Sequence, residues 1–281
     1  MTPKSELHFV ERDPYTPIAY LYPVERVLHR EKSPFQEILV FESPFFGKVL
    51  ALDGIVQLTE RDEFFYHEML AHVPLHLHPC PRRVCVVGGG DGGTLREVLK
   101  HREVEEVVLV EIDPRVVEVS RKFFPALSTG FDDPRTQIVH RDGADYMVGE
   151  KGRFEVILVD STDPVGWAER LFKEEFLRAT YEALTEEGIL VEQTESLHFH
   201  LSFVREIQLR LSEVFPYVYL YTVALATYGG NWWTFSLGSK KSLGSPRPLK
   251  VPTRFYSEEV HSQSFLPQEL YKHLLQGDLP W

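Results

Sequence analysis

Acidic side chains recur through the middle of this sequence, each at or just beyond the end of an apolar run. They are Asp91, Glu111, Asp142, Asp160, Asp163 and Glu195. If the apolar runs are strands of one parallel sheet, their carboxyl ends meet at one edge, where ligands bind in open α/β sheets. One acid at a strand end is commonplace because Asp and Glu cap helices, but an acid after each of five consecutive runs is not. The pattern therefore predicts an anionic pocket for a positively charged ligand.

The first of these acids lies in a glycine-rich loop. Residues 83–111 read RVCVVGGGDGGTLREVLKHREVEEVVLVE, in which Gly88, Gly90 and Gly93 fit G-x-G-x-x-G between an apolar run and a helix-like segment. This is the nucleotide-binding βαβ arrangement. A dinucleotide would place its pyrophosphate over this turn, where the Asp91 carboxylate would repel it. The loop favours an adenosine ligand with a cationic tail; the alternative is that Asp91 only caps the following helix.

Distance along the chain suggests a role for each remaining acid. Glu111 is placed to accept hydrogen bonds from two ribose hydroxyls, as acids at that strand end do. Asp142, after the third expected strand, could accept from an adenine amino group. The later acids remain for a second, cationic substrate: Asp160, Asp163 and Glu195. The Tyr66 hydroxyl and the Gln193 amide are candidate neutral partners.

Composition supports a cationic ligand and excludes some partners. Asp and Glu outnumber Lys and Arg by 42 to 30, giving a net charge of −12. This balance disfavours a nucleic-acid partner, whose phosphates need a basic surface, whereas a negative field concentrates cations. No apolar run approaches the ~18 residues of a membrane span, and no signal peptide opens the chain, so we expect a cytoplasmic protein. Cys80 and Cys85 form no disulfide framework, and Cys85 is expected in the core.

Apolar and helix-like segments alternate from Arg83 onward, which predicts a mostly parallel sheet covered on both faces. We expect strands at residues 84–87, 107–110, 136–140, 156–159 and 189–192, a helix at 198–213, and a final β pair near 218–221 and 233–237. The predicted fold class is α/β, with a Rossmann-like domain over residues 63–281. Residues 161–171 (STDPVGWAERL) are predicted to form a loop that covers the site.

Residues 1–62 are predicted to form a small β-rich domain or a dimerisation arm. A strand is expected at residues 35–41, and residues 48–52 and 55–59 flank Asp53-Gly54, a strong hairpin signal. Residues 60–72 have helical periodicity, and Pro74, Pro79 and Pro81 are expected to mark the passage into the first strand of the main domain. Histidines 67, 72, 76 and 78 fit no zinc-binding spacing, so we expect them to be solvated and to bind no metal.

Several longer motifs resemble the spermidine synthases, the polyamine aminopropyltransferases. They are GGGDGG with LREVLKH, VEID-P, the Asp142-Gly143 pair, DSTDP-x-G, LDGIVQLTERDEFFYHEML and the late RFYSEEVHSQSFLP. The resemblance covers nearly the whole chain. It implies a small N-terminal β-domain, a methyltransferase-like Rossmann domain, and homodimers or homotetramers. It also implies transfer of an aminopropyl group from decarboxylated S-adenosylmethionine, as co-substrate, to a polyamine amine, with release of methylthioadenosine and no metal or redox cofactor.

The resemblance also implies roles for individual residues. The nucleoside contacts would be Gln36, Gly88, Gly90, Glu111, Asp142 and Gly143. The acceptor side would comprise His67, Asp163, Gln193, Glu195 and Tyr221. Between these sets, Asp91 would hold the ammonium of the aminopropyl group. Asp160 would accept the proton of the attacking amine while Tyr66 orients its nitrogen.

Two departures from the family pattern fall near the expected substrate entrance. Trp167 stands where the family has proline in DP-x-GPA, and Ala226–Asn231 replaces the family's PTYPSG. These departures bear on the choice of acceptor and leave the reaction class intact. The resemblance implies putrescine as acceptor, with cadaverine, agmatine or a longer polyamine as alternatives. An S-adenosylmethionine-dependent amine N-methyltransferase is a rival enzyme, a non-catalytic polyamine-binding protein is a rival of another class, and an NAD-dependent oxidoreductase is a more distant one.

Overall fold

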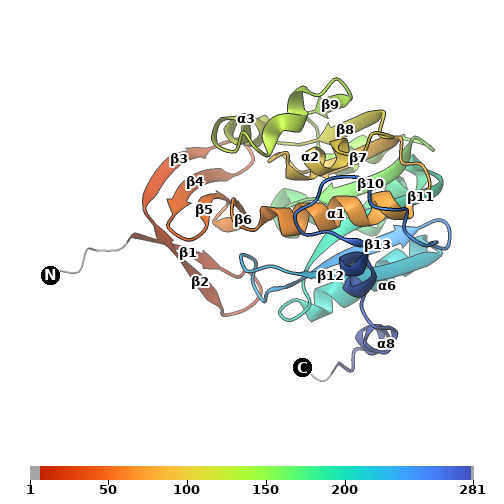
Figure 1. Ribbon diagram of the computed structural model, residues 1–281. Helices are drawn as coiled ribbons and strands as arrows, with labels where there is room; N and C mark the ends of the chain where they lie inside the picture. The colour runs from red at the N-terminus through yellow and green to blue at the C-terminus, as the bar shows by residue number, and fades with distance from the viewer. Residues whose placement is uncertain (1–6, 280–281) are drawn as a thin grey trace.

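The computed structural model of the chain describes residues 7–279 and contains one seven-stranded sheet (Figure 1). Its strand order is β12-β13-β11-β10-β7-β8-β9. The strands are β7 (Arg83–Gly88), β8 (Glu106–Val110), β9 (Thr136–Val139), β10 (Phe154–Asp160), β11 (Leu184–Ser196), β12 (Tyr217–Ala224) and β13 (Trp232–Ser239). Strands β7 to β11 are parallel, and β13 is antiparallel to both of its neighbours. The predicted α/β class with a mostly parallel sheet is confirmed.

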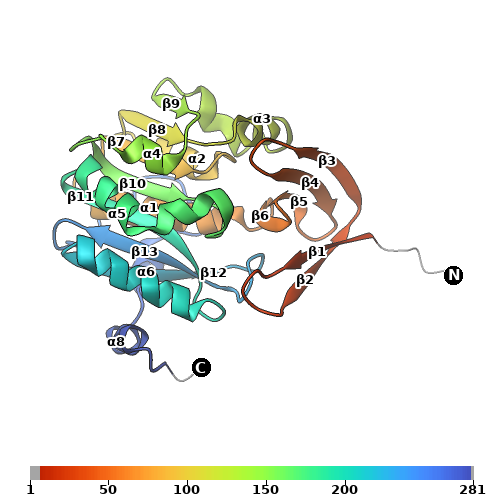
Figure 2. The same cartoon turned by 180° about the vertical axis from the view of Figure 1, so that it is seen from behind.

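Burial on both faces explains the continuous apolar strands. In β7, β8 and β10, the valine, isoleucine and leucine side chains are almost fully buried, which suits a sheet covered by helices on both sides. Helices α1 (Glu63–Leu77) and α2 (Gly93–Leu99) pack on one face. Helices α4 (Gly143–Met147), α5 (Glu174–Ala183) and α6 (Leu201–Val214) pack on the other (Figure 2). Cys85 lies in this second core, as predicted.

Helix α1 extends further than the sequence predicts. It continues through Pro74 to Leu77, so the proline that we expected to follow the helix lies inside it. The residues of α1 are buried on nearly all sides, and burial of this kind outweighs the preference of proline for helix ends. The histidines expected to be solvated are buried in consequence: His67, His72, His76 and His78.

The N-terminal segment forms two antiparallel sheets. One pairs β1 (Leu7–Arg12) with β2 (Ala19–Val24), and the other has the order β3 (Arg26–Lys32), β4 (Glu37–Ser43), β5 (Gly47–Leu52), β6 (Ile55–Thr59). The predicted hairpin is confirmed: Asp53 and Gly54 join β5 to β6 with φ of 48° and 85°, as a type I′ turn requires. Both sheets lie beyond one end of the large sheet (Figure 1). Val116 and Val119 of α3 (Pro114–Phe123) pack against the four-stranded one.

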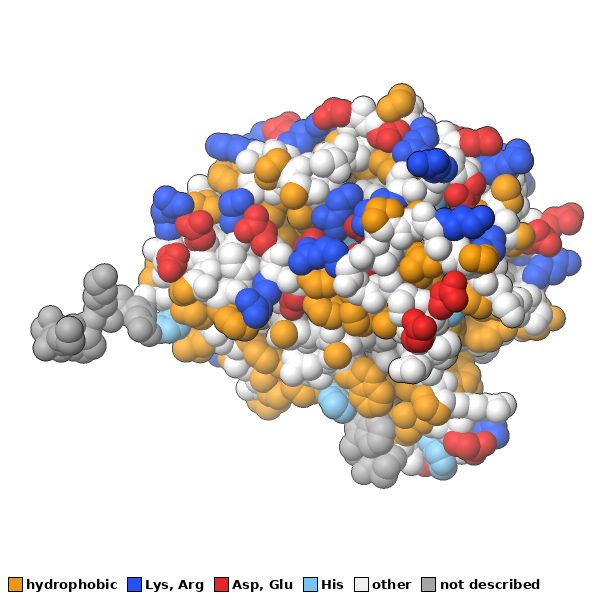
Figure 3. All heavy atoms as spheres, viewed as in Figure 1, with side chains coloured by type: hydrophobic (Ala, Val, Ile, Leu, Met, Phe, Trp, Pro, Cys, Tyr) orange, Lys and Arg blue, Asp and Glu red, His pale blue; other side chains and the backbone are white. Residues whose placement is uncertain are grey.

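The C-terminal segment returns along α1. Glu68 accepts hydrogen bonds from the backbone N–H groups of Arg254, Phe255 and Tyr256 at 2.7 to 2.8 Å. The segment ends with α7 (Glu258–Ser264) and α8 (Gln268–Gln276). In the described part of the chain, every helix is too short or too polar to cross a membrane. On the face seen in Figure 3, basic and acidic side chains are interspersed.

Candidate functional site

A cavity of about 620 Å³ opens at the carboxyl edge of the large sheet and extends towards the N-terminal strands. It brings together most of the predicted site residues: Gln36, Tyr66, His67, Gly88, Gly90, Asp91, Glu111, Asp142, Gly143, Asp160 and Asp163. A second cavity of about 40 Å³ shares Tyr66, Asp163 and Tyr228 with the first. Gln193 and Glu195 line this narrow cavity. The acids predicted to share one edge therefore line two adjoining spaces.

Glycine is needed in the loop because other chain segments approach it closely. A Cβ atom on Gly88, where φ is +80°, would lie 2.1 Å from the carbonyl oxygen of Asp160. A Cβ atom on Gly93 would lie 2.2 Å from the His67 ring. The Gly89 N–H donates to the Asp160 carbonyl at 2.8 Å, which ties the loop to the end of β10. The loop thus holds Asp91 and Asp160 beside each other.

Asp160 accepts hydrogen bonds from two neutral hydroxyl groups. The Tyr66 hydroxyl donates to Oδ1 at 2.8 Å and the Thr94 hydroxyl to Oδ2 at 2.6 Å. Burial, followed by repulsion from Asp91, raises the pKa of Asp160 to about 6. The nearby charge of His67 and the two hydroxyl donors act in the opposite direction. The group is therefore a stronger base than an exposed carboxylate, yet it is mostly ionised at neutral pH.

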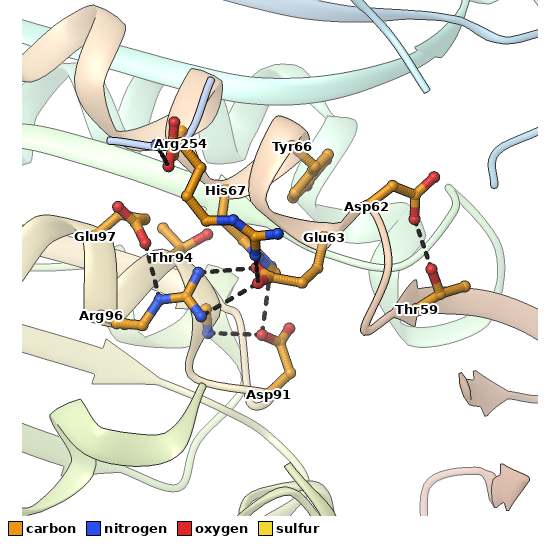
Figure 4. Close-up of polar contacts among 12 residues, drawn as sticks. Thr59, Asp62, Glu63, Tyr66, His67, Asp91, Thr94, Arg96, Glu97 and Arg254 are labelled. Atoms are coloured by element: carbon orange, nitrogen blue, oxygen red, sulfur yellow. Dashed lines mark hydrogen bonds and ion pairs between the residues drawn. The ribbon is translucent and has the colours of Figure 1, made fainter. Parts of the chain in front are cut away.

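Asp91 lies beside a buried imidazolium. Its Oδ1 accepts from the Gly93 N–H at 2.7 Å and lies 3.3 Å from His67 Nε2. The other ring nitrogen of His67 lies 2.7 Å from Glu63, which also receives Arg96 (Figure 4). Burial opposes the charge on His67, but Asp91 and Glu63 raise its pKa to about 10. In turn, and against the effect of burial, His67 lowers the pKa of Asp91. His67 thus holds Asp91 in its anionic form.

Three of the predicted nucleoside contacts line the large cavity beside the glycine loop and α4: Gln36, Glu111 and Asp142. Glu111 accepts from the Gly90 and Asp113 N–H groups at 3.1 and 2.9 Å, and burial raises its pKa to about 7. Gln36 donates to Asp113 at 3.0 Å. Asp142 caps α4 by accepting from the N–H groups of residues 144 and 145. Its Oδ2 accepts a hydrogen bond from the Arg170 guanidinium at 2.7 Å, so this acid has a basic neighbour that the sequence pattern did not predict.

The narrow cavity is acidic. Burial and the neighbouring Glu195 raise the pKa of Asp163 well above its usual range. Burial raises the pKa of Glu195 to about 8. Gln193 donates to the Ser161 and Thr162 carbonyl groups at 3.2 and 3.4 Å and so fixes the start of the segment predicted to cover the site. That segment continues into a 3₁₀ helix, η2 (Gly166–Phe172), and residues 160–163 and 165–168 line the large cavity.

Both departures from the family pattern border the cavities, as predicted. Trp167 is 56% exposed, and its ring packs edge-on against Phe35 with 5.9 Å between ring centroids. Both rings line the large cavity. Tyr228, from the Ala226–Asn231 segment, donates to the Gln57 carbonyl group and lines both cavities.

The structure does not bring Tyr221 to the site. Its side chain is fully buried, its hydroxyl donates to the Met69 carbonyl at 3.1 Å, and its ring stacks on Phe235. The prediction that Tyr221 lines the acceptor channel is therefore wrong, because this face of β12 packs into the core.

Other site residues were absent from the predicted set. They are Glu11, Asp13, Tyr20, Gln57, Thr94, His200 and Tyr228. Several come from the N-terminal strands, whose position over the sheet edge is a tertiary feature without a sequence motif. Away from the cavities, His72, His76 and His101 gather in the core, with 2.9 Å between His72 Nδ1 and His101 Nε2.

The fold and site together define a class of enzyme. The sheet and glycine turn have the arrangement of a Rossmann-like nucleotide-binding site, and a half-buried carboxyl group with a raised pKa beside an acidic cavity suits group transfer to an amine.

Comparison with known proteins narrows the class to one family. The spermine/spermidine synthase domain model matches residues 63–246, and the spermidine synthase tetramerisation domain model matches residues 7–60. Polyamine aminopropyltransferase 1 of Aquifex aeolicus is 54% identical over 97% of this chain and 98% of its own length. The polyamine aminopropyltransferase of a Hydrogenobaculum species is 51% identical over 98% and 99%. The chain belongs to the spermine/spermidine synthase family, so the predicted family and enzyme class are confirmed.

Solved structures agree with this assignment. A spermidine synthase in complex with the transition-state analogue AdoDATO has a TM-score of 0.93 and 41% identity, over 98% of this chain and 97% of its own. The spermidine synthase of Thermotoga maritima has a TM-score of 0.92 and 41% identity, over 98% and 96%.

Proposed function

We propose that the chain transfers an aminopropyl group from decarboxylated S-adenosylmethionine to putrescine, giving spermidine and methylthioadenosine. The observation that carries this proposal is Asp160, a half-buried carboxyl group with a raised pKa, held by Tyr66 and Thr94 beside the anionic Asp91. Membership of the family and the similarity to a spermidine synthase that binds a transition-state analogue support it.

The donor would lie in the large cavity with its ribose hydroxyls at Glu111 and its adenine near Asp142. The ammonium of the aminopropyl group would face Asp91. A donor that kept the methionine carboxylate would place that group beside Asp91, and the two negative charges would repel each other. This is the reason to prefer the decarboxylated donor to S-adenosylmethionine itself.

The acceptor would enter by the narrow cavity. Its nitrogen attacks the methylene carbon next to the sulfonium, a C–N bond forms, the C–S bond breaks, and methylthioadenosine leaves. A primary alkylammonium has a pKa near ~10.4, so the amine must lose a proton before it can attack. Asp160 accepts this proton while Tyr66 orients the nitrogen. The enzyme otherwise acts by positioning, because the sulfonium already provides a good leaving group.

The other predicted site residues would have supporting roles. Gln36, Gly88, Gly90 and Gly143 would shape the nucleoside site, and His67 would hold Asp91 anionic. Asp163, Gln193 and Glu195 would receive the distal end of the acceptor. Exposed apolar side chains on β1 and β2 would join copies of the chain into a homodimer or homotetramer, as the match to a tetramerisation domain suggests.

Product analysis with two donors tests the proposed reaction. The protein is incubated with putrescine and either decarboxylated S-adenosylmethionine or S-adenosylmethionine, and products are identified by mass spectrometry. We expect spermidine and methylthioadenosine from the decarboxylated donor alone. Adenosylhomocysteine and a methylated amine from S-adenosylmethionine, without reaction of the other donor, would instead identify an N-methyltransferase.

A further inference from the structure

A histidine lies between two carboxyl groups at the wall of the narrow cavity. His200 Nε2 lies 3.0 Å from Asp13 Oδ2, and Nδ1 lies 3.0 Å from Glu195 Oε2. The side chains of His200, Asp13 and Glu195 are 5%, 6% and 2% exposed. They come from the start of α6, the connection between β1 and β2, and the end of β11. Three distant parts of the chain thus converge on this imidazole.

The helix does not require this side chain. His200 is the N-cap residue of α6, but its ring makes no capping hydrogen bond. The Tyr15 ring packs edge-on against it at 5.3 Å, and the Tyr15 hydroxyl donates to the Pro164 carbonyl at 3.3 Å. His200 therefore contacts groups that border the acceptor cavity and the covering segment.

Acidic side chains outnumber basic ones in the wall of this cavity. Four carboxyl groups line it: Glu11, Asp13, Asp163 and Glu195. Among the described residues that line it, His200 is the one side chain able to carry a positive charge. Glu195 Oε1 is buried without a hydrogen-bond donor beside it. A buried carboxyl oxygen that lacks a hydrogen-bond donor is costly, so an ammonium group placed beside Oε1 would be favoured.

His200 lies in the cavity that is proposed to receive the acceptor. His200, Asp13 and Glu195 line the narrow cavity and are absent from the wall of the large one, whereas Tyr66 and Asp163 line both. An amine that reaches Asp160 past Tyr66 would therefore extend its other end towards His200. A cavity of about 40 Å³ suits a thin alkyl chain.

We propose that His200 sets the length of the acceptor because its imidazole, held between Asp13 and Glu195, occupies the place that the third ammonium of a longer polyamine would take. This inference rests on the proposed function. A diamine ends before His200, and its distal ammonium is received by Glu195 and Asp163. A triamine would have to displace the imidazole from both carboxyl groups, so the site discriminates by excluding the longer acceptor.

Acceptor kinetics of His200 variants test this role. The ratio of kcat/KM for spermidine to that for putrescine is measured with the decarboxylated donor in the wild type, His200→Ala, His200→Gln and, as a matched histidine control, His273→Asn on the exposed α8. We expect His200→Ala to raise the ratio by about 100-fold, because it opens space and frees two carboxylates for a third ammonium. His200→Gln refills the space and should return the ratio to within about tenfold of the wild type.

A second variant, Asp13→Asn, tests the proposal independently in case His200→Ala does not fold. Asp13→Asn removes a carboxylate that holds the imidazole and should raise the ratio in the same direction, and thermal unfolding reports the integrity of each protein. An equal change of kcat/KM for both acceptors would overturn the role of His200 and leave the proposed function intact. Absence of methylthioadenosine from the wild type with every amine would overturn the proposed function and this inference together.

Discussion

At the scale of single residues, the proposed chemistry depends on how its neighbours set the pKa of Asp160. Burial and Asp91 raise this pKa to about 6, whereas the imidazolium of His67 lowers it. Asp160 must be ionised to accept a proton, so activity should be lost as the pH falls through about 6. The charge on His67 thus sets the position of this acidic limb without contact with the reacting nitrogen.

Replacing His67 by asparagine should move the acidic limb of the kcat profile to higher pH. The neutral side chain no longer stabilises the Asp160 carboxylate by its charge, so protonation occurs at a higher pH than in the wild type. The pH dependence of kcat with saturating substrates measures this shift, and His273→Asn should leave the profile unchanged. An unshifted limb in His67→Asn would show that another group controls it.

At the scale of secondary-structure elements, the packing of α1 against α2 depends on a missing side chain. A Cβ atom on Gly93 would lie 2.2 Å from the His67 ring, whereas one on the exposed Gly244 meets no atom within 4 Å. Gly93→Ala should therefore cost about 1–3 kcal/mol of stability and reduce activity, because His67 must move away from Asp91. Gly244→Ala should be nearly neutral. Thermal unfolding and turnover compare them, and equal unfolding temperatures would refute the packing argument.

Strand β11 contains a buried acid that the proposed mechanism does not use. Both oxygens of Glu192 are buried without hydrogen-bond partners, and burial raises its pKa from 4.5 to about 8. Between these values the unfolded chain has released the proton that the folded chain keeps, so stability falls as the pH rises. Glu192→Gln should remove this loss and stabilise the protein by about 2–4 kcal/mol at pH ~8.5, with little effect near pH ~4.

Urea unfolding at the two pH values measures this gain. Glu187→Gln changes an exposed acid of the same strand and is the matched control. A destabilised Glu192→Gln variant at the higher pH would show that the carboxyl group has a partner that stabilises its ionised form.

The strands and turns could be predicted from the sequence where neighbouring residues alone determine the local structure. The β-branched runs at 84–87 and 107–110 became strands β7 and β8, and Asp53-Gly54 became the hairpin turn. The end of α1 was predicted too early, before Pro74. Burial of the helix on nearly all sides outweighs the preference of proline for helix ends. Tyr221 misled the prediction of the site, because alternation along a strand does not say which face packs into the core.

The remaining site residues could not be predicted because they depend on how the N-terminal sheets meet the large one. Glu11 and Asp13 lie nearly 200 residues from Glu195 and His200 in the sequence, yet all four line one cavity. Only tertiary structure brings such segments together. The acids at strand ends were predictable, whereas Arg170 beside Asp142 was not. His67 was predicted on the acceptor side, and its contact with Asp91 became visible only in the fold.

At the scale of the whole molecule, the β1–β2 hairpin presents an apolar face. Val10 and Leu21 are paired across the hairpin, so they share one face, and they are 43% and 62% exposed. Leu21→Lys should therefore shift the protein towards smaller species, because a charge would have to be buried at the proposed interface. Analytical ultracentrifugation measures the change, and an unchanged mass for Leu21→Lys would place the interface elsewhere. Val148→Lys, at an exposed apolar site outside the hairpin, is the control.

The most direct test of the account is the turnover of Asp160→Asn with decarboxylated S-adenosylmethionine and putrescine, measured beside its affinity for methylthioadenosine. Asparagine keeps the shape of the side chain but cannot accept the proton. We predict that kcat falls about 10²–10⁴-fold. The dissociation constant of methylthioadenosine should change little, because the proposed nucleoside contacts are Glu111 and the glycine loop. Turnover equal to that of the wild type would contradict the assignment of Asp160 as the base.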